Sequence, residues 1–409
     1  MREGRDLGEV RSNDFSRRCY EPSLCVECMK TFIVQGQVYT PGGVIADGVV
    51  VVEDGRIAAV GPRAAVAVPP DARIIDAAGQ RVIPGLIDLH IHGLLEASAR
   101  SDVSSLAEAL PRFAVTGFLP TIGSSSPQDT LQAVRDIAAA IQTRPPGARM
   151  LGIHLEGPYV SPRRPGAMEP FFVRPFSWEE FQLLQEAAQG HIRLLTIAPE
   201  VPPARQYIPQ LVAQGVIVAI GHSDATYEEA LEAIGLGVSH ATHIFNAMRP
   251  FHHREPGAIG AVLLHPGVTA QVIGDGEHVH PAAIALLVQA KGAQGVALVS
   301  DAMPLAGLPP GEYVSRGKRL LSNGRAIRLP EGQLVGSATL LNGGLRTLVE
   351  QVGLSWTEAL TIAAAVPARV LGLPTGRLEA GLDADLVILN DDYQPRLTMV
   401  QGEVVYQAA

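Results

Sequence analysis

The sequence has few cysteines and few aromatic residues. Only 3 cysteines occur in 409 residues, and all of them, Cys19, Cys25 and Cys28, lie near the start of the chain. The rest of the chain therefore has no thiols for a disulfide framework. Cys25 and Cys28 form a C-x-x-C pair, but no second pair is nearby to complete the four ligands of a structural zinc site.

Long apolar runs and strong charge of one sign are also missing. No uninterrupted apolar stretch reaches the roughly 18 residues of a transmembrane helix, and the polar start of the chain has no secretory core. The net charge is -9 without a run of like charge, so neither nucleic acid nor a membrane surface is an expected partner. We expect a cytoplasmic protein in which residues 1–30 form a disordered extension.

The composition that is present predicts a large fold with a small accessory domain. With 47% hydrophobic residues, a chain of this length can fill two cores. Residues 31–61 read as short strands, with Asp54-Gly55 placed for a tight hairpin. ADLVILN and MVQGEVVYQ near the other end show the same pattern of short strands. We predict a small β-sandwich domain built from residues 31–84 and 373–409.

Residues 85–372 alternate apolar runs with helical stretches, which is typical of a parallel sheet with crossover helices. The pattern predicts a (β/α)8 TIM-like barrel; the alternative is a doubly wound sheet, which usually has fewer strands and a Gly-rich turn that is missing here. The helical candidates include Gln128–Ile141, Glu179–Ala188, Tyr227–Ile234 and Pro281–Gln289. The eight strand candidates are Gly85–His92, Thr116–Ile122, Met150–Gly157, Arg193–Glu200, Val216–Ser223, Gly237–His243, Val268–Gly276 and Val296–Ala302.

Six polar residues stand at or close to the carboxyl ends of five of these runs. In a barrel those ends share one face, where catalytic groups collect. A buried cluster of histidines and carboxylates is costly unless it is coordinated, so we predict one or two divalent ions there. Imidazole and carboxylate suit Zn and also tolerate Fe, Co or Mn. The predicted ligands are His90, His92, Glu156, His222, His243 and Asp301.

Two other histidines lie on the same strand candidates. His154 shares a strand face with Glu156, and it either supports that carboxylate or is a hydrogen-bonded core residue. His240 precedes His243 by an odd offset, so we expect its side chain to point the other way.

Six strings in this order resemble the N-acetylglucosamine-6-phosphate deacetylases of the amidohydrolase superfamily: PGLIDLHIHG, HLEGPYVSPRRPGA, IGHSDAT, ATHIFNAM followed by REPG, GDGEHVHP and SDAMPLAG. The resemblance covers residues 32–405. It implies that Glu156, His222 and His243 hold the main ion. It also implies a second ion held by His90, His92 and Asp301 and bridged by Glu156.

The resemblance also implies an activity. A metal-activated water attacks the acetyl carbonyl of N-acetylglucosamine 6-phosphate, with Asp301 as general base and then acid, and glucosamine 6-phosphate and acetate are formed. Arg254 comes from the neighbouring subunit of a homodimer, and the backbone of residues 334–336 belongs to a loop near the substrate. The implied substrate contacts are Ala167, Asn246, Ala247, Arg254, His278, Leu334, Val335 and Gly336.

One departure from the family pattern concerns the acyl group. Relatives commonly carry a histidine that hydrogen-bonds the acyl carbonyl twelve residues after the metal-binding glutamate, whereas this chain has Met168, which has no hydrogen to donate.

Three alternatives stay open. In the first, the substrate is N-acetylgalactosamine 6-phosphate. In the second, it is another N-acyl compound. In the third, the barrel is catalytically silent and serves as an assembly or regulatory protein. Glu156 argues against enzymes of cyclic ureides, which need a modified lysine. A silent relative would be expected to lose ligands, and all six are present.

Overall fold

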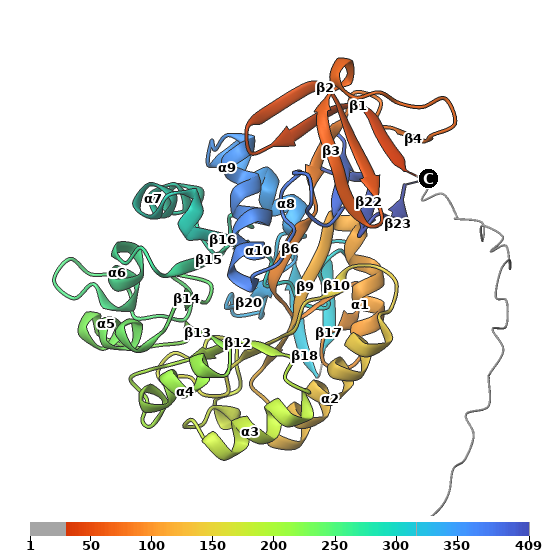
Figure 1. Ribbon diagram of the computed structural model, residues 1–409. Helices are drawn as coiled ribbons and strands as arrows, with labels where there is room; N and C mark the ends of the chain where they lie inside the picture. Colours follow the sequence, from red (N-terminus) through yellow and green to blue (C-terminus); the bar gives the residue numbers. More distant parts are fainter. Residues whose placement is uncertain (1–29, 316, 409) are drawn as a thin grey trace, which may run out of the picture.

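The structure, a computed structural model, describes residues 30–408 except residue 316 (Figure 1). The expectations for Cys19, Cys25, Cys28 and an N-terminal extension therefore concern residues outside the described part. Within that part, every helix is too short or too polar to cross a membrane.

Strands from both ends of the described chain form one eight-stranded sheet, which confirms the prediction that the two ends build a common β domain. Strand β5 pairs with β21, with Ile83 opposite Val387, so the two ends join in the middle of the sheet (Figure 1). Asp54 and Gly55 both have positive φ in the turn between β2 and β3, which confirms the predicted hairpin. The strands are β1 (Thr31–Thr40), β2 (Gly43–Glu53), β3 (Arg56–Pro62), β4 (Arg73–Asp76), β5 (Arg81–Pro84), β21 (Leu386–Leu389), β22 (Pro395–Val400) and β23 (Glu403–Gln407).

Eight parallel strands between these ends close into a barrel. The last strand returns to the first, because Ala302 bridges to Ile91 and the Asp301 backbone N–H donates to the His90 carbonyl at 2.8 Å. This closure confirms the (β/α)8 prediction over an open doubly wound sheet. The barrel strands are β6 (Leu86–Ile91), β9 (Val115–Gly123), β11 (Ile153–Glu156), β12 (Ile192–Ile197), β13 (Ile217–Ile220), β14 (His240–Ala241), β15 (Thr269–Ile273) and β16 (Val296–Val299). The short β10 (Arg149–Met150) adds to β9.

Helices surround the barrel and begin where the sequence provides caps (Figure 1). The side chains of Ser126, Ser177 and Thr226 each accept a hydrogen bond from the backbone N–H three residues later, which satisfies one of the free donors of the first turn. The helices are α1 (Val103–Ala109), α2 (Pro127–Thr143), α3 (Trp178–Ala187), α4 (Ile208–Ala213), α5 (Tyr227–Leu236), α6 (Gly257–Leu264), α7 (Pro281–Lys291), α8 (Leu341–Arg346), α9 (Trp356–Leu360) and α10 (Val366–Leu371). Their apolar faces and the outward side chains of the strands form the main core.

An antiparallel sheet is inserted between β16 and α8, and the sequence did not predict it. Its strands are β17 (Gly311–Ser315), β18 (Lys318–Ser322), β19 (Ala326–Arg328) and β20 (Leu334–Ser337). Residues 334–336 therefore lie on a strand and not in a loop, which corrects that expectation. Most side chains of β17 and β18 are exposed or half-buried, so these segments have no continuous apolar run that would mark them as strands.

Candidate metal centre

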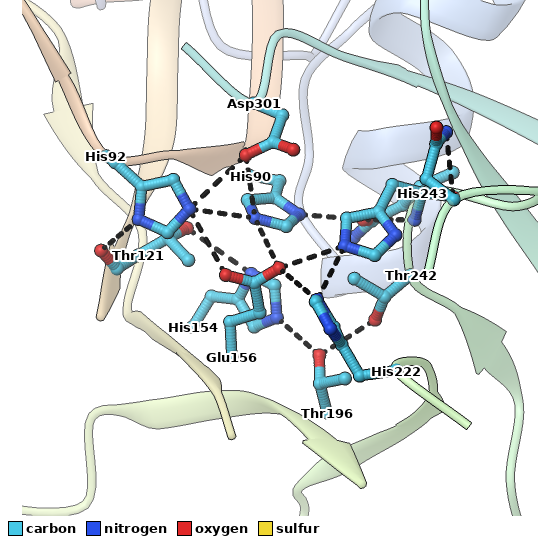
Figure 2. A network of polar contacts seen from close by, with 12 residues as sticks. His90, His92, Thr121, His154, Glu156, Thr196, His222, Thr242, His243 and Asp301 are labelled. Atoms are coloured by element: carbon cyan, nitrogen blue, oxygen red, sulfur yellow. Dashed lines mark hydrogen bonds and ion pairs between the residues drawn. The ribbon is translucent and has the colours of Figure 1, made fainter. Parts of the chain in front are cut away.

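The six predicted ligands come together at one end of the barrel (Figure 2). His90 lies on β6 and His92 directly follows that strand, while Glu156 is the last residue of β11. His222, His243 and Asp301 each lie two residues beyond the end of a strand, β13, β14 and β16 respectively. The carboxyl ends of parallel strands in a closed barrel face the same way, so six residues far apart in sequence meet at one site.

Three of these residues have an unusual backbone. The φ angles of His222, His243 and Asp301 are 46°, 25° and 48°, in a left-handed region that residues with a Cβ adopt rarely. Each angle occurs where the chain leaves its strand. Such conformations cost about 1–3 kcal/mol each and persist where the surroundings enforce them. We infer that these turns hold the three side chains over the barrel.

Glu156, His222 and His243 form the first of two groups of ligand atoms. Nε2 of His222 lies 3.1 Å and Nε2 of His243 lies 3.0 Å from Oε1 of Glu156, and the two ring nitrogens are 3.0 Å apart. All three residues are buried. Three potential ligand atoms therefore point at a common centre that excludes most of the solvent.

His90, His92 and Asp301 form the second group, and Glu156 lies between the two. Oδ1 of Asp301 is 3.3 Å from Nε2 of His90 and from Nε2 of His92. Oε2 of Glu156 lies 3.2 Å from Nε2 of His92, while its Oε1 faces the first group. One carboxylate thus contacts both groups with different oxygens, as a bridging ligand would.

The chemistry of these donors fits divalent ions. Two donors bound at about 2.0–2.1 Å to one tetrahedral ion lie roughly 3.3 Å apart, which is close to the spacings found here. Nδ1 of His92 faces the Thr121 carbonyl at 3.1 Å, and Nδ1 of His222 faces the Arg164 carbonyl at 3.0 Å. A carbonyl only accepts, so each Nδ1 carries a hydrogen, and in its neutral form each ring turns the Nε2 lone pair to the centre.

The histidines of the site compensate the negative charges of two buried carboxylates, Glu156 and Asp301. Burial lowers the pKa of His90 and His92, but the charges and hydrogen bonds of Asp301 and Glu156 outweigh burial, so the pKa of His90 is raised and that of His92 rises to about 10. Burial raises the pKa of Glu156 and Asp301, yet nearby histidines lower both below their usual range. Protons and a divalent cation therefore compete for the same positions.

Two further histidines lie inside the barrel next to the cluster. The two ring nitrogens of His154 contact the hydroxyls of Thr121 and Thr196, at 3.3 and 2.8 Å, so its ring is a hydrogen-bonded core residue. His240 is fully buried, and burial together with the charge of His90 lowers its pKa to about 3. His240 pairs in register with Ala219, which packs against residues of other barrel strands inside the barrel, so the His240 ring also points inward, which corrects the prediction from its odd offset. That prediction was wrong because β14 ends at Ala241 and the positive φ of His243 breaks the strand alternation.

The implied substrate contacts lie at different distances from the cluster. A Cβ added at Gly166, the neighbour of Ala167, would lie 3.0 Å from the His222 ring and 3.3 Å from Ala247. The side-chain amide of Asn246 donates to the His243 carbonyl at 3.3 Å. A backbone hydrogen bond places β20 beside Asp301, because the Ser337 N–H donates to the Asp301 carbonyl at 3.0 Å. Leu334, Val335 and Gly336 are the three residues that precede Ser337 on this strand.

His278 and Arg254 differ sharply in their surroundings. His278 is held by Asp275, with 2.6 Å between Nδ1 and Oδ2, and the charge of Asp301 acts on its pKa. Arg254 is exposed on the loop before α6, where its Nη1 lies 3.0 Å from Nε2 of His253. Among the described residues, no hydrogen bond or ion pair connects Arg254 with the six ligands of its own chain.

Gln271, Asp275 and Met168 make contacts close to the cluster that residue spacing did not predict. Gln271 contacts His90 and the backbone of His243. The available signal for it was a glutamine surrounded by apolar residues in the middle of β15. Met168 is half-buried, and the Ser124 hydroxyl donates to its sulfur at 3.0 Å. Ser124 follows Gly123, where an added Cβ would lie 3.7 Å from the His92 ring.

Comparisons with known proteins give one consistent result. The amidohydrolase family profile matches residues 81–405. The chain is 37% identical to an N-acetylglucosamine-6-phosphate deacetylase of Bacillus subtilis, over 90% of this chain and 95% of that protein. It is 33% identical to an N-acetylgalactosamine-6-phosphate deacetylase of Escherichia coli O157:H7, over 90% and 97%. A variant of the Mycobacterium smegmatis N-acetyl-D-glucosamine-6-phosphate deacetylase, solved in complex with N-acetyl-D-glucosamine-6-phosphate, superposes with a TM-score of 0.84 at 33% identity, covering 92% of this chain and 100% of that one.

Proposed function

The chain belongs to the amidohydrolase family, and we propose that it hydrolyses the acetamide of N-acetylglucosamine 6-phosphate to glucosamine 6-phosphate and acetate. The observation that carries this proposal is the pair of ligand groups sharing Glu156 at the barrel mouth. The names of the relatives supply the substrate class. The complete ligand set speaks against a catalytically silent barrel.

We propose two divalent ions per chain, one at Glu156, His222 and His243 and the other at His90, His92 and Asp301. Zn is the preferred candidate because imidazole and carboxylate at these spacings suit a tetrahedral ion, and Fe, Co or Mn are alternatives. When bound, the ions lower the pKa of a water molecule and polarise the acyl carbonyl.

Asp301 is the proposed proton carrier. The pKa of its carboxyl is lowered because neighbouring histidines outweigh its burial, so it is ionised and able to accept a proton near neutral pH. It then holds that proton beside the scissile bond and donates it to the leaving nitrogen, which becomes a free amine. The side chain is 14% exposed, so it borders the space that is open to the substrate.

The sugar phosphate is proposed to bind among the loops around the cluster. Ala167, Asn246 and Ala247 lie beside His222 and His243, and Leu334, Val335 and Gly336 lie beside Asp301. His278 is fixed by Asp275, which raises the pKa of the ring and so favours the positive charge that would suit an anionic substrate. Arg254 supplies a planar pair of donors for the phosphate.

We propose that Arg254 reaches the site of a second subunit in a homodimer. Its loop and the two helices that follow carry exposed apolar side chains, namely Phe251, Leu264 and Leu286 at 55%, 73% and 66% exposure. They lie on or next to α6 and α7, which are neighbours in the ring of helices (Figure 1). Exposed apolar surface of this kind marks contact sites.

The galactosamine epimer is the second candidate because a relative of similar identity is named for it. The test is to incubate purified, metal-loaded protein with N-acetylglucosamine 6-phosphate, N-acetylgalactosamine 6-phosphate and unphosphorylated N-acetylglucosamine, and to measure free amine. We expect the highest kcat/KM with the glucosamine compound. Higher kcat/KM with its epimer would exchange the two candidates, and no turnover on either phosphate would refute the deacetylase function.

A further inference from the structure

Gln271 contacts one residue of each ligand group. It lies on β15, between the strand that leads to His243 and the strand that leads to Asp301. Its side chain is fully buried. The oxygen Oε1 is 3.2 Å from Nδ1 of His90 and 3.3 Å from the backbone nitrogen of His243.

The orientation of the Gln271 amide follows from its backbone contact. The N–H of His243 can only donate, so the atom that faces it must be the amide oxygen and not the nitrogen. The same oxygen faces Nδ1 of His90, which therefore carries the hydrogen and donates it. Neutral His90 is then held in the tautomer that leaves Nε2 free, and Nε2 is the atom that faces Glu156 and Asp301.

A second consequence concerns the turn at His243. Its φ of 25° is far from the ordinary range for a residue with a Cβ. The two backbone donors around this turn are both bound to Gln271, because the Ile244 N–H donates to the Gln271 carbonyl at 2.9 Å. Main chain and side chain of Gln271 thus both hold the turn that carries a ligand of the first group.

We propose that Gln271 is a positioning residue shared by the two metal sites, which sets the tautomer of His90 and supports the turn at His243 with a single amide. This inference rests on the proposed two-ion centre, but not on the identity of the sugar. It assigns unequal effects to the two sites. Removing the amide takes away the one acceptor that the described residues offer to Nδ1 of His90, whereas the turn at His243 keeps the bond from the Ile244 N–H to the Gln271 carbonyl.

The test compares Gln271→Met with Gln271→Glu in ion-free protein titrated with Zn by equilibrium dialysis. Methionine keeps the length of the side chain but is a poor acceptor, whereas glutamate keeps an acceptor for both N–H groups. We expect Gln271→Met to weaken binding of one of two ions by roughly 10–100-fold, the usual effect of losing such a partner. Gln271→Glu should retain both ions.

Controls separate this effect from damage to the fold. Thr242→Val removes a buried hydroxyl beside His243 that bonds Thr196 and no ligand, so it should leave both affinities unchanged. Thermal unfolding of the ion-free variants shows whether each is folded. The proposal would be overturned if Gln271→Met bound both ions as tightly as the wild type. It would also be overturned if Gln271→Glu lost an ion as completely as Gln271→Met. Wild-type protein that binds a single ion at saturation would also overturn it. None of these outcomes bears on the proposed activity, which is tested separately by turnover of the sugar phosphate.

Discussion

Oδ1 of Asp301 lies 3.3 Å from Nε2 of His92, so the proposed proton carrier is also one of the three residues of the second ligand group. The two roles can be separated with Asp301→Asn. An amide oxygen can still bind an ion, but it does not accept a proton at neutral pH. We expect kcat to fall roughly 10²–10⁴-fold while the metal content, measured on the same sample, stays the same. A variant that keeps most of its turnover would remove Asp301 from the proton-carrying role.

The number of ions depends on the two histidines of β6. His90 and His92 make up two of the three residues of the second group. Replacing both by asparagine removes their imidazoles but leaves Glu156, His222 and His243 intact. We expect bound metal to fall from two ions per chain to one, measured by elemental analysis after dialysis. Two ions in the variant, or one in the wild type, would contradict the assignment of this group.

The fold and the ligands could be predicted from sequence because both depend on short-range patterns. Apolar runs such as Val296–Ala302 mark barrel strands, and the polar residue at the end of each run lies on the catalytic face by geometry. The sheet of β17–β20 could not be found in this way because most side chains of β17 and β18 are exposed. It is also held by contacts that are remote in sequence, such as the salt bridge between Lys318 and Glu169.

Side-chain direction was the harder part of the site. Strand alternation predicts which side a residue faces only while the strand continues, and β14 has just two residues. The left-handed backbone of His243 then brings its ring into the cluster although His240 also points inward. No local sequence signal marks such a turn at histidine, since the residue most tolerant of positive φ is glycine.

Met168 is the residue most open to a test of specificity. It lies against Ser124, close to the His92 side of the centre. A histidine at this position would add a donor to the acyl oxygen, whose charge increases in the transition state. We expect Met168→His to raise kcat on the acetyl substrate about tenfold, a fraction of the usual contribution of one such donor. Met168→Leu, which keeps the apolar bulk, is the matched control and should behave like the wild type in steady-state kinetics.

Lower activity of Met168→His with an unchanged Met168→Leu variant would show that a donor is not accepted at this position. In that case the thioether fits a different acyl group, and a series of N-acyl glucosamine 6-phosphates of increasing chain length would identify it.

Arg254 allows a test of subunit exchange. If it acts on the neighbouring site, Arg254→Ala and Asp301→Asn dimers are each nearly inactive, but a mixed dimer has one intact site. Equal mixing of the two variants with subunit exchange should restore about a quarter of the wild-type sites, as expected for a two-fold symmetric dimer. The activity of the mixture is compared with the activity of each variant alone and with that of a mixture in which the subunits have not exchanged. The absence of any gain, when mass analysis shows that mixed dimers have formed, would place Arg254 in the site of its own subunit or outside both.

The pair of His278 and Asp275 should make stability depend on pH. Burial lowers the pKa of His278, but the hydrogen bond and charge of Asp275 outweigh burial and raise it. Burial raises the pKa of Asp275, and His278 more than offsets this effect and lowers it. A raised histidine pKa stabilises the fold below the ordinary value of about 6.5, and this contribution is lost as the pH rises through the raised value. The lowered aspartate pKa stabilises the fold above about pH 3.9, and this contribution is lost as the pH falls through the lowered value.

The stabilisation by this pair is therefore greatest between about pH 4 and 6.5 and declines as the pH rises through the raised pKa of His278. We expect His278→Gln to lower the free energy of unfolding by about 1–3 kcal/mol near pH 6, because Asp275 loses its charged partner in a buried position. The difference from the wild type should shrink as the pH is raised to 9. Urea unfolding of both ion-free proteins across this range measures it. A difference that does not change between pH 6 and pH 9 would mean that His278 is held as a neutral ring and does not carry the proposed positive charge toward the substrate.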